Sequence, residues 1–215
     1  MGAGNLNRFN TLAPYYDRLA SFVFGGAVQK AQEHFISHVP HGSRVLVLGG
    51  GTGKLLDRLL HVPDVSVCFV EASSVMIRLA KQRVGVAGNV QFIHGTVDSV
   101  PTPANFEVIV APFFLDLFSN ATLDKELREI SARCDKTNTT WIVTDFISNQ
   151  RWHRVFLWVM YAFFRLTCRL STAGLPAWEN ALFRHGLIEQ QVAYFYNGFI
   201  KTALYHRNPD ADYSL

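Results

Sequence analysis

Charged residues are scarce in this sequence of 215 residues, because Asp, Glu, Lys and Arg together make up only 17% of it. About a quarter is usual for soluble domains. The formal net charge is +3, which is too small to indicate a nucleic-acid partner. The low charge accompanies an apolar content of 49% and 17 phenylalanines. This composition predicts an apolar pocket or interface in addition to an ordinary core.

Cysteine is also rare, and the three cysteines lie far apart in apolar runs, at Cys68, Cys134 and Cys168. An odd number with wide spacing favours reduced, buried thiols in a cytoplasmic protein over a disulfide framework or a metal site. The N-terminus, Met1–Asn5, lacks the basic and then apolar segments of a signal peptide. The sequence contains no repeats, and its length predicts a single domain over residues 1–215.

The most informative segment joins an apolar run, Val45–Leu48, to the glycine-rich stretch Gly49–Gly53. The apolar run predicts a buried strand, and the leucine spacing in Lys54–Leu60 predicts a helix directly after the glycines. A strand, a glycine loop and a helix N-terminus together form a geometry that receives an anionic group of a nucleotide-like cofactor. The G-x-G-x-x-G dinucleotide pattern is not met, and no G-K-[ST] follows to make a phosphate-binding P-loop.

An acidic residue follows the next expected strand, Val65–Val70, at Glu71. An acid at this place accepts hydrogen bonds from ribose hydroxyls in dinucleotide-binding folds. Acids at strand ends are also common in solvated turns, so Glu71 alone is a weak signal. The helix that follows is expected to begin at Ser73 or Ser74, either of which suits an N-cap.

Taken together, these segments resemble the class I S-adenosylmethionine-dependent methyltransferases. Gly49–Gly53 is similar to the first motif of that family, and Glu71 with Met76 is similar to its ribose- and adenine-binding segment. Val90–Pro101 resembles the family's third strand and the segment after it, and Phe106–Ala111 resembles its fourth strand. Phe9–Asp17 is similar to the F-x-x-x-A-x-x-Y-D opening of small-molecule methyltransferases, including those that act on quinone precursors.

The resemblance implies S-adenosyl-L-methionine as the cofactor and covers about residues 40–146. By position it implies the following cofactor-binding residues: Tyr16, Gly49, Gly50, Gly51, Thr52, Gly53, Glu71, Ala72, Met76, Thr96, Val97, Asp98 and Ala111. Two positions depart from the family, since Val47 and Thr96 stand where an acid is usual. Either Asp98 takes over the adenine contact, or packing and backbone groups alone hold the adenine.

The order of the expected elements predicts an α/β fold, a Rossmann-like, doubly wound sheet of seven strands. An N-terminal helical cap is expected over residues 1–40, the cofactor-binding core over 41–146, and a lid helix with the last helix over 147–186. Two final strands over 187–206, joined at Asn197-Gly198, predict an antiparallel hairpin. Such a hairpin is typical of the methyltransferase sheet, and a dinucleotide dehydrogenase normally lacks it.

The segment Arg151–Leu170 is the most unusual of the chain. A helical wheel places Arg151, Arg154, Trp158, Tyr161, Arg165 and Arg169 on one narrow stripe of an otherwise apolar helix. About 20 helical residues span about 30 Å, but four arginines and His153 argue against a lipid-embedded span. Three roles stay open: a helix packed on the sheet with its arginines in solvent, a lid over the acceptor site, and docking on a membrane surface.

Methyl transfer asks little covalent chemistry of a protein, so no catalytic residue is assigned. The residues expected around the acceptor are Phe114, Asp116, His153 and Phe156, of which Asp116 and His153 are the base candidates. Ala111 stands where amino-group methyltransferases carry Asn or Asp, which argues against methylation of adenine or glutamine. The predicted acceptor is therefore a small, apolar or aromatic molecule. The alternative is a non-catalytic relative that binds the cofactor or a lipid, and the oligomeric state is left open.

Overall fold

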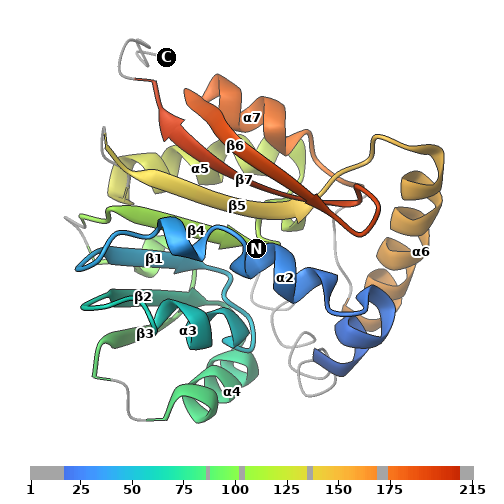
Figure 1. Cartoon of the computed structure of the whole chain (residues 1–215). Helices are drawn as coiled ribbons and strands as arrows, with labels where there is room; N and C mark the ends of the chain where they lie inside the picture. The colour runs from blue at the N-terminus through green and yellow to red at the C-terminus, as the bar shows by residue number, and fades with distance from the viewer. Residues whose placement is uncertain (1–16, 86–87, 102–104, 135–137, 169–173, 209–215) are drawn as a thin grey trace.

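The computed structural model describes residues 17–85, 88–101, 105–134, 138–168 and 174–208. Its centre is one sheet of seven strands, as predicted, and the strands follow the order β3-β2-β1-β4-β5-β7-β6 (Figure 1). The strands are β1 (Arg44–Leu48), β2 (Ser66–Glu71), β3 (Val90–His94), β4 (Val108–Pro112), β5 (Thr140–Phe146), β6 (Leu187–Phe195) and β7 (Ile200–Arg207). The first five are parallel to one another, and β7 is antiparallel to both of its neighbours.

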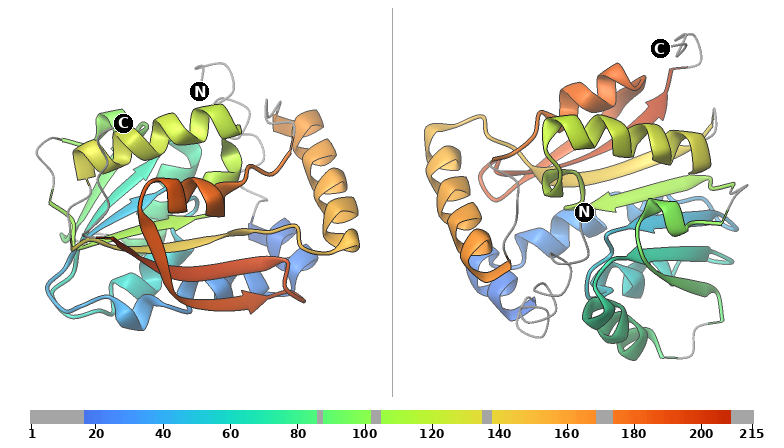
Figure 2. Two further views of the ribbon diagram at one scale, coloured as in Figure 1. Left: turned by 90° about the horizontal axis from the view of Figure 1, so that it is seen from above. Right: turned by 180° about the vertical axis from the view of Figure 1, so that it is seen from behind.

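Helices cover both faces of this sheet, so each central strand is buried on both sides. The helices are α2 (Ala27–Glu33), α3 (Lys54–Leu59), α4 (Ser74–Val84), α5 (Asn120–Cys134), α6 (Arg151–Cys168) and α7 (Trp178–Arg184). Figure 1 shows α3 and α4 in front of the sheet, and Figure 2 shows α5 and α7 behind it. Alternate residues of β1 serve the two layers, because Val45 and Val47 pack toward α3 while Leu46 and Leu48 pack toward α5.

The predicted C-terminal hairpin is confirmed. Its turn places Tyr196, Asn197 and Gly198 at φ of 50°, 52° and 78°, a conformation that Asn and Gly adopt most readily. Strand β7 then pairs with β5 over its whole length, and the hydroxyls of Thr144 and Thr202 lie 2.8 Å apart across the pair. This pairing joins the hairpin to the five parallel strands in one sheet.

A third apolar cluster lies beyond the carboxyl end of β5 and joins α6 to the N-terminal helix (residues 17–24). Phe24 of the N-terminal helix meets Leu157 and Tyr161 of α6 there, together with Phe199 from the hairpin turn. α6 itself stands apart from the sheet, with the N-terminal helix beside it (Figures 1 and 2).

The expected stripe on α6 needs one correction. Arg151, Arg154 and Trp158 are exposed as expected, but Tyr161 is buried in the apolar cluster. Tyr161 lies at one edge of the predicted stripe, and the apolar cluster covers that edge. The solvent-exposed side of the helix is therefore displaced to the other edge, where Val155 and Val159 lie. The side chains of Arg165 and Arg169 lie outside the described residues. No helix in the described part of the chain is long and apolar enough to cross a membrane.

Candidate functional site

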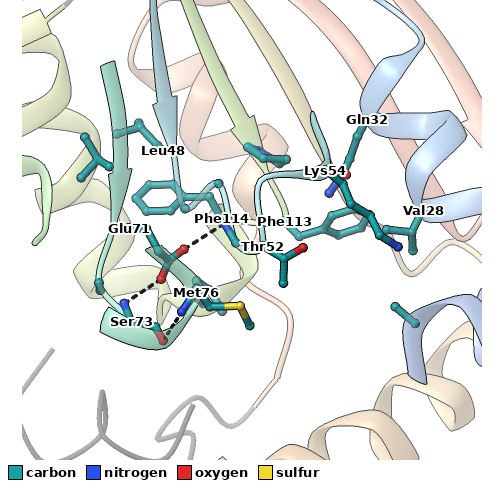
Figure 3. Close-up of a pocket in the computed structure, with 18 of the residues that line it drawn as sticks. Val28, Gln32, Leu48, Thr52, Lys54, Glu71, Ser73, Met76, Phe113 and Phe114 are labelled. Carbon is teal, nitrogen blue, oxygen red and sulfur yellow. Dashed lines mark hydrogen bonds between the residues drawn. The ribbon is translucent and has the colours of Figure 1, made fainter. Parts of the chain in front are cut away.

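A cavity opens at the carboxyl ends of β1, β2 and β4, beside the point where the strand order reverses from β1 to β4. Ligands bind at such switch points in open α/β sheets. The first helices of the chain form the opposite wall, with Asp17, Ala20, Ser21, Val28, Gln29 and Gln32 (Figure 3). The cavity therefore lies between the sheet and the N-terminal helical cap.

Packing against neighbouring side chains requires glycine at two positions of the loop after β1. A Cβ at Gly50 would lie 2.1 Å from Cε2 of Phe69, and a Cβ at Gly53 would lie 2.7 Å from that of Ala80. Gly53 also has a φ of 78°, which L side chains rarely adopt. The loop consequently lies flat against β2 and α4, with its backbone facing the cavity.

Glu71 joins this loop to the start of α4. Its Oε2 accepts a hydrogen bond from the backbone N–H of Gly51 at 3.0 Å, and its Oε1 accepts one from that of Ser73 at 2.8 Å. The side chain of Ser73 in turn caps α4 by accepting from the N–H of Met76 at 3.2 Å, as Figure 3 shows. Burial raises the pKa of the Glu71 carboxyl, and these backbone hydrogen bonds oppose the rise.

Asp17 fastens the N-terminal wall to the glycine loop, a role that the sequence analysis missed. Its Oδ1 accepts from the hydroxyl of Thr52 at 2.8 Å, and its Oδ2 accepts from Arg83 at 3.0 Å. Lys54 Nζ lies 3.7 Å from the same Oδ2. The sequence did contain a signal, because Asp17 is the last residue of the F-x-x-x-A-x-x-Y-D motif, but no role was predicted for it.

Most of the remaining wall of the cavity is apolar. It is formed by Leu48, Val70, Met76, Val97, Pro112, Phe113, Phe114, Leu117 and Phe118. Phe113 has a φ of 50°, which is unusual for a bulky residue, and its N–H donates to the carbonyl of Thr144 at 2.7 Å. This strained position turns the chain after β4 so that two consecutive aromatic side chains face the cavity.

Most of the cofactor-binding residues expected from the sequence line this one cavity. They are Gly49, Gly50, Gly51, Thr52, Glu71, Ala72, Met76, Thr96 and Val97. Ala111 instead lies fully buried in the core beneath it, and Pro112 takes the place on the wall. Gly53 does not line the cavity and instead lies against Ala80 of α4. Tyr16 lies outside the described residues.

Asp98 faces away from the cavity. Its side chain is 72% exposed, and its Oδ1 lies 4.0 Å from a guanidinium nitrogen of Arg133. Glu126 of α5 lines the cavity instead, beside Thr96 and Val97. Burial and the nearby Asp98 raise the pKa of Glu126. Its position in the middle of a helix gave no sequence signal, because nothing local marks which helical turn meets the segment after β3.

Of the expected acceptor residues, only Phe114 lines the cavity among the described side chains. The His153 ring is fully buried against Phe199, and its Nδ1 accepts from the N–H of Asn149 at 3.2 Å. Phe156 packs edge-on against Phe24, with ring centroids 5.8 Å apart. No described side chain of α6 reaches the cavity, so its role as a lid stays a prediction.

Asp116 belongs to a buried acidic pair behind the aromatic wall. Asp145 accepts hydrogen bonds from the backbone N–H groups of Leu115, Asp116 and Phe146 at 3.0, 3.1 and 2.8 Å. Burial raises the pKa of Asp145 to about 7. Burial and the Asp145 carboxyl raise the pKa of Asp116 well above its usual value. Asp116 Oδ1 and the Tyr161 hydroxyl have no hydrogen-bond partner among the described residues.

Comparison with known proteins places the whole arrangement in one family. A family model described as a methyltransferase domain matches residues 45–136. The ubiquinone/menaquinone biosynthesis C-methyltransferase UbiE of Azotobacter vinelandii is 30% identical over an alignment of 175 residues, and the match covers 76% of this chain and 68% of that protein. UbiE of Ectopseudomonas mendocina is 33% identical over 116 residues, which are 50% of this chain. This chain matches only 45% of the length of the latter protein.

Solved structures share the fold. A DhpI complex with SAH has a TM-score of 0.71 at 15% identity, covering 97% of this chain and all of that one. An O-methyltransferase from neocarzinostatin biosynthesis, in complex with S-adenosylmethionine and 2-hydroxy-5-methyl naphthoic acid, has a TM-score of 0.65 at 16% identity. The latter comparison covers 95% of this chain and 60% of that one.

The buried acidic pair predicts a stability that falls as the pH rises. Both carboxyls have folded-state pKa values above their unfolded values, and that of Asp145 is about 7. Each therefore stays protonated in the folded state at pH values where it is ionised in the unfolded state, and stability is lost as the pH rises from about 4 through 7. Asp116→Asn mimics the protonated form and should lessen the loss between pH 5 and pH 8 by about 1–3 kcal/mol. Urea unfolding at the two pH values measures this, with the exposed Asp98→Asn as control. An unchanged loss in Asp116→Asn would contradict it.

Proposed function

Because the chain belongs to the class I S-adenosylmethionine-dependent methyltransferases, we propose that it transfers a methyl group from S-adenosyl-L-methionine to a small, lipophilic acceptor. The observation that carries this proposal is one cavity in which a flat glycine loop and a strand-end carboxylate face an apolar, aromatic wall. The loop and the carboxylate suit a polar cofactor, and the aromatic wall suits an acceptor without charge.

The cofactor half of the cavity is assigned to the glycine loop and Glu71. Backbone at Gly49–Thr52 would lie against the methionine part, since these residues line the cavity and a Cβ added at Gly51 would project into open space. Each oxygen of Glu71 accepts a backbone hydrogen bond, and a carboxylate has about four lone-pair sites, so acceptor capacity remains for a ribose hydroxyl. When bound, S-adenosyl-L-methionine supplies an activated methyl group on its sulfonium.

The adenine end is assigned to Met76, Val97 and Glu126. Met76 and Val97 contribute apolar surface for the ring. Thr96, which has no carboxylate, stands where the family usually has Asp, and Asp98 faces solvent, so no carboxylate of that segment serves the adenine amino group. Glu126 is the carboxylate that lines this part of the cavity. It would accept a hydrogen bond from the amino group, supplied from α5 in place of the segment after β3.

The acceptor half is assigned to the aromatic residues after β4 and to the N-terminal wall. Phe113, Phe114, Ala20 and Val28 all line the cavity, and holding an acceptor against these side chains would supply rate acceleration through orientation. The buried Asp116 and His153 lie away from this space, so neither is assigned as a base. The UbiE relatives are named as C-methyltransferases of ubiquinone and menaquinone biosynthesis, which supports an aromatic, lipophilic acceptor. A cytoplasmic location and a contact between residues 151–170 and a membrane surface complete the proposal.

Incubation with methyl-labelled cofactor tests the activity. With a lipid and quinone extract as acceptor source, label should move into an organic-soluble product, because the acceptor half of the cavity is apolar. Label confined to protein or nucleic acid would contradict a small-molecule acceptor. Tight S-adenosylhomocysteine binding without transfer to any extract would favour the alternative of a non-catalytic, cofactor- or lipid-binding relative.

Replacing Glu71 tests the ribose assignment. Glu71→Ala removes both acceptor oxygens from a mostly buried site, so S-adenosylhomocysteine should bind more weakly by about 1–3 kcal/mol. Titration calorimetry measures the affinity, and thermal unfolding checks that the loss of the Gly51 and Ser73 hydrogen bonds leaves the fold intact. Glu129→Ala, which removes an acid paired with Arg133 on the surface of α5, is the matched control. Equal affinity in Glu71→Ala and the control would remove Glu71 from the site.

Glu126 has a test that separates recognition from stability. Its carboxylate should favour the 6-amino group of adenine and disfavour the 6-oxo group of hypoxanthine. Glu126→Gln offers an amide N–H to the oxo group, so the affinity ratio of S-adenosylhomocysteine to S-inosylhomocysteine should fall about tenfold. Asp98→Asn should leave that ratio unchanged. The same ratio in wild type and Glu126→Gln would argue that packing and backbone alone hold the base.

A further inference from the structure

The outer face of α6 combines large apolar side chains with arginines. Val155, Trp158 and Val159 are 65%, 72% and 52% exposed, and Arg151 and Arg154 lie exposed beside them. We call these five residues the outer face. Their spacing of three and four residues puts them on one side of the helix. A surface helix with its arginines merely in solvent would carry polar residues there, so this face is unusual for a free surface.

The exposure of the outer face does not result from poor packing of α6. On its opposite side, His153, Leu157 and Tyr161 are buried, and Phe156 meets the rings of Phe24 and Phe199 with centroids 5.8 and 5.1 Å away. This packing fixes the rotation of the helix. Rotation of α6 therefore cannot bury Trp158 without exposing the inner side chains.

The neighbouring N-terminal helix adds a further exposed apolar residue, Phe22. Phe22 is 89% exposed, and its helix lies beside α6 in both Figures 1 and 2. The adjoining residues Ala20 and Ser21 line the cavity. The same short helix thus has one side on the cavity and another directed outward.

The charge of this region selects its partner. No Asp or Glu occurs between Asp145 and Glu179 in the sequence, whereas four arginines do. A second copy of the chain would bring like charges together in an isologous contact. An anionic lipid surface accepts all three kinds of side chain, because Trp prefers the headgroup level, Val enters the acyl boundary and Arg reaches the phosphates.

We propose that the outer face of α6 docks on an anionic lipid bilayer, with α6 lying in the plane of the interface and Phe22 entering beside it. The docking itself depends only on this surface. It rests on the proposed function in one respect, that a lipophilic acceptor would pass from the bilayer to the cavity along the N-terminal helix.

Flotation of the full chain with vesicles tests the docking. Binding to vesicles rich in phosphatidylglycerol should exceed binding to pure phosphatidylcholine vesicles, and added salt should weaken it. The double variant Arg151→Glu, Arg154→Glu and the variant Trp158→Ala should each bind anionic vesicles at least tenfold more weakly. Phe183→Ala is the matched control, since Phe183 is 73% exposed on α7, away from the outer face. It should bind as wild type does.

Three results would overturn the proposal. The first is that the wild type does not bind anionic vesicles, and the second is that the outer-face variants bind them as strongly as Phe183→Ala does. The third is a dimer in solution that Trp158→Ala abolishes, because this result would assign the face to a second copy. S-adenosylhomocysteine affinity should be the same in all variants, which shows that they fold. Vesicle binding without S-adenosylhomocysteine binding in wild type would reject the proposed function and leave the docking intact.

Discussion

The buried carboxylate of Glu71 is the interaction on which the cavity depends. It accepts hydrogen bonds from the N–H of Gly51, in the loop after β1, and from the N–H of Ser73, at the start of α4. Two segments that are separated in the sequence are therefore held together by one carboxylate. Burying a carboxylate is costly, which is why the pKa of Glu71 rises. The cost is tolerable because backbone hydrogen bonds offset it, and a ligand hydroxyl would offset it further.

The glycine loop shows how local constraints made this part predictable. Strand, glycines and helix follow one another without a break in the sequence, and each has its own pattern. The structure adds a reason that the sequence could not reveal, since Gly50 is required by the ring of Phe69 on the next strand. The hairpin was predictable in the same way, because Asn197-Gly198 carries its turn chemistry locally. The side on which Asp98 and Glu126 face depends on contacts between distant segments, and the sequence held no sign of it.

The acceptor residues were harder to predict for a related reason. A position just after a strand end suggests nearness to the ligand, but the turn at Leu115–Leu117 carries Asp116 behind the aromatic wall, where Asp145 holds its backbone. A helical wheel for α6 gave the angles between side chains correctly. It could not fix the rotation, which depends on Phe24 and Phe199 from opposite ends of the chain. Tyr161 is therefore buried and Val155 exposed.

The N-terminal helix brings these features together. Asp17 of this helix is hydrogen-bonded to Thr52 of the glycine loop and to Arg83 of α4, while Phe24 packs in the apolar cluster that includes Leu157 and Tyr161 of α6. Between the two attachments, the helix forms part of the cavity wall. A force on α6, such as docking on a bilayer, would act through Phe24 on the same helix that Asp17 holds against the loop. A displacement of α6 would therefore reach the cavity wall through residues 17–24, without a contact between α6 and the cavity itself.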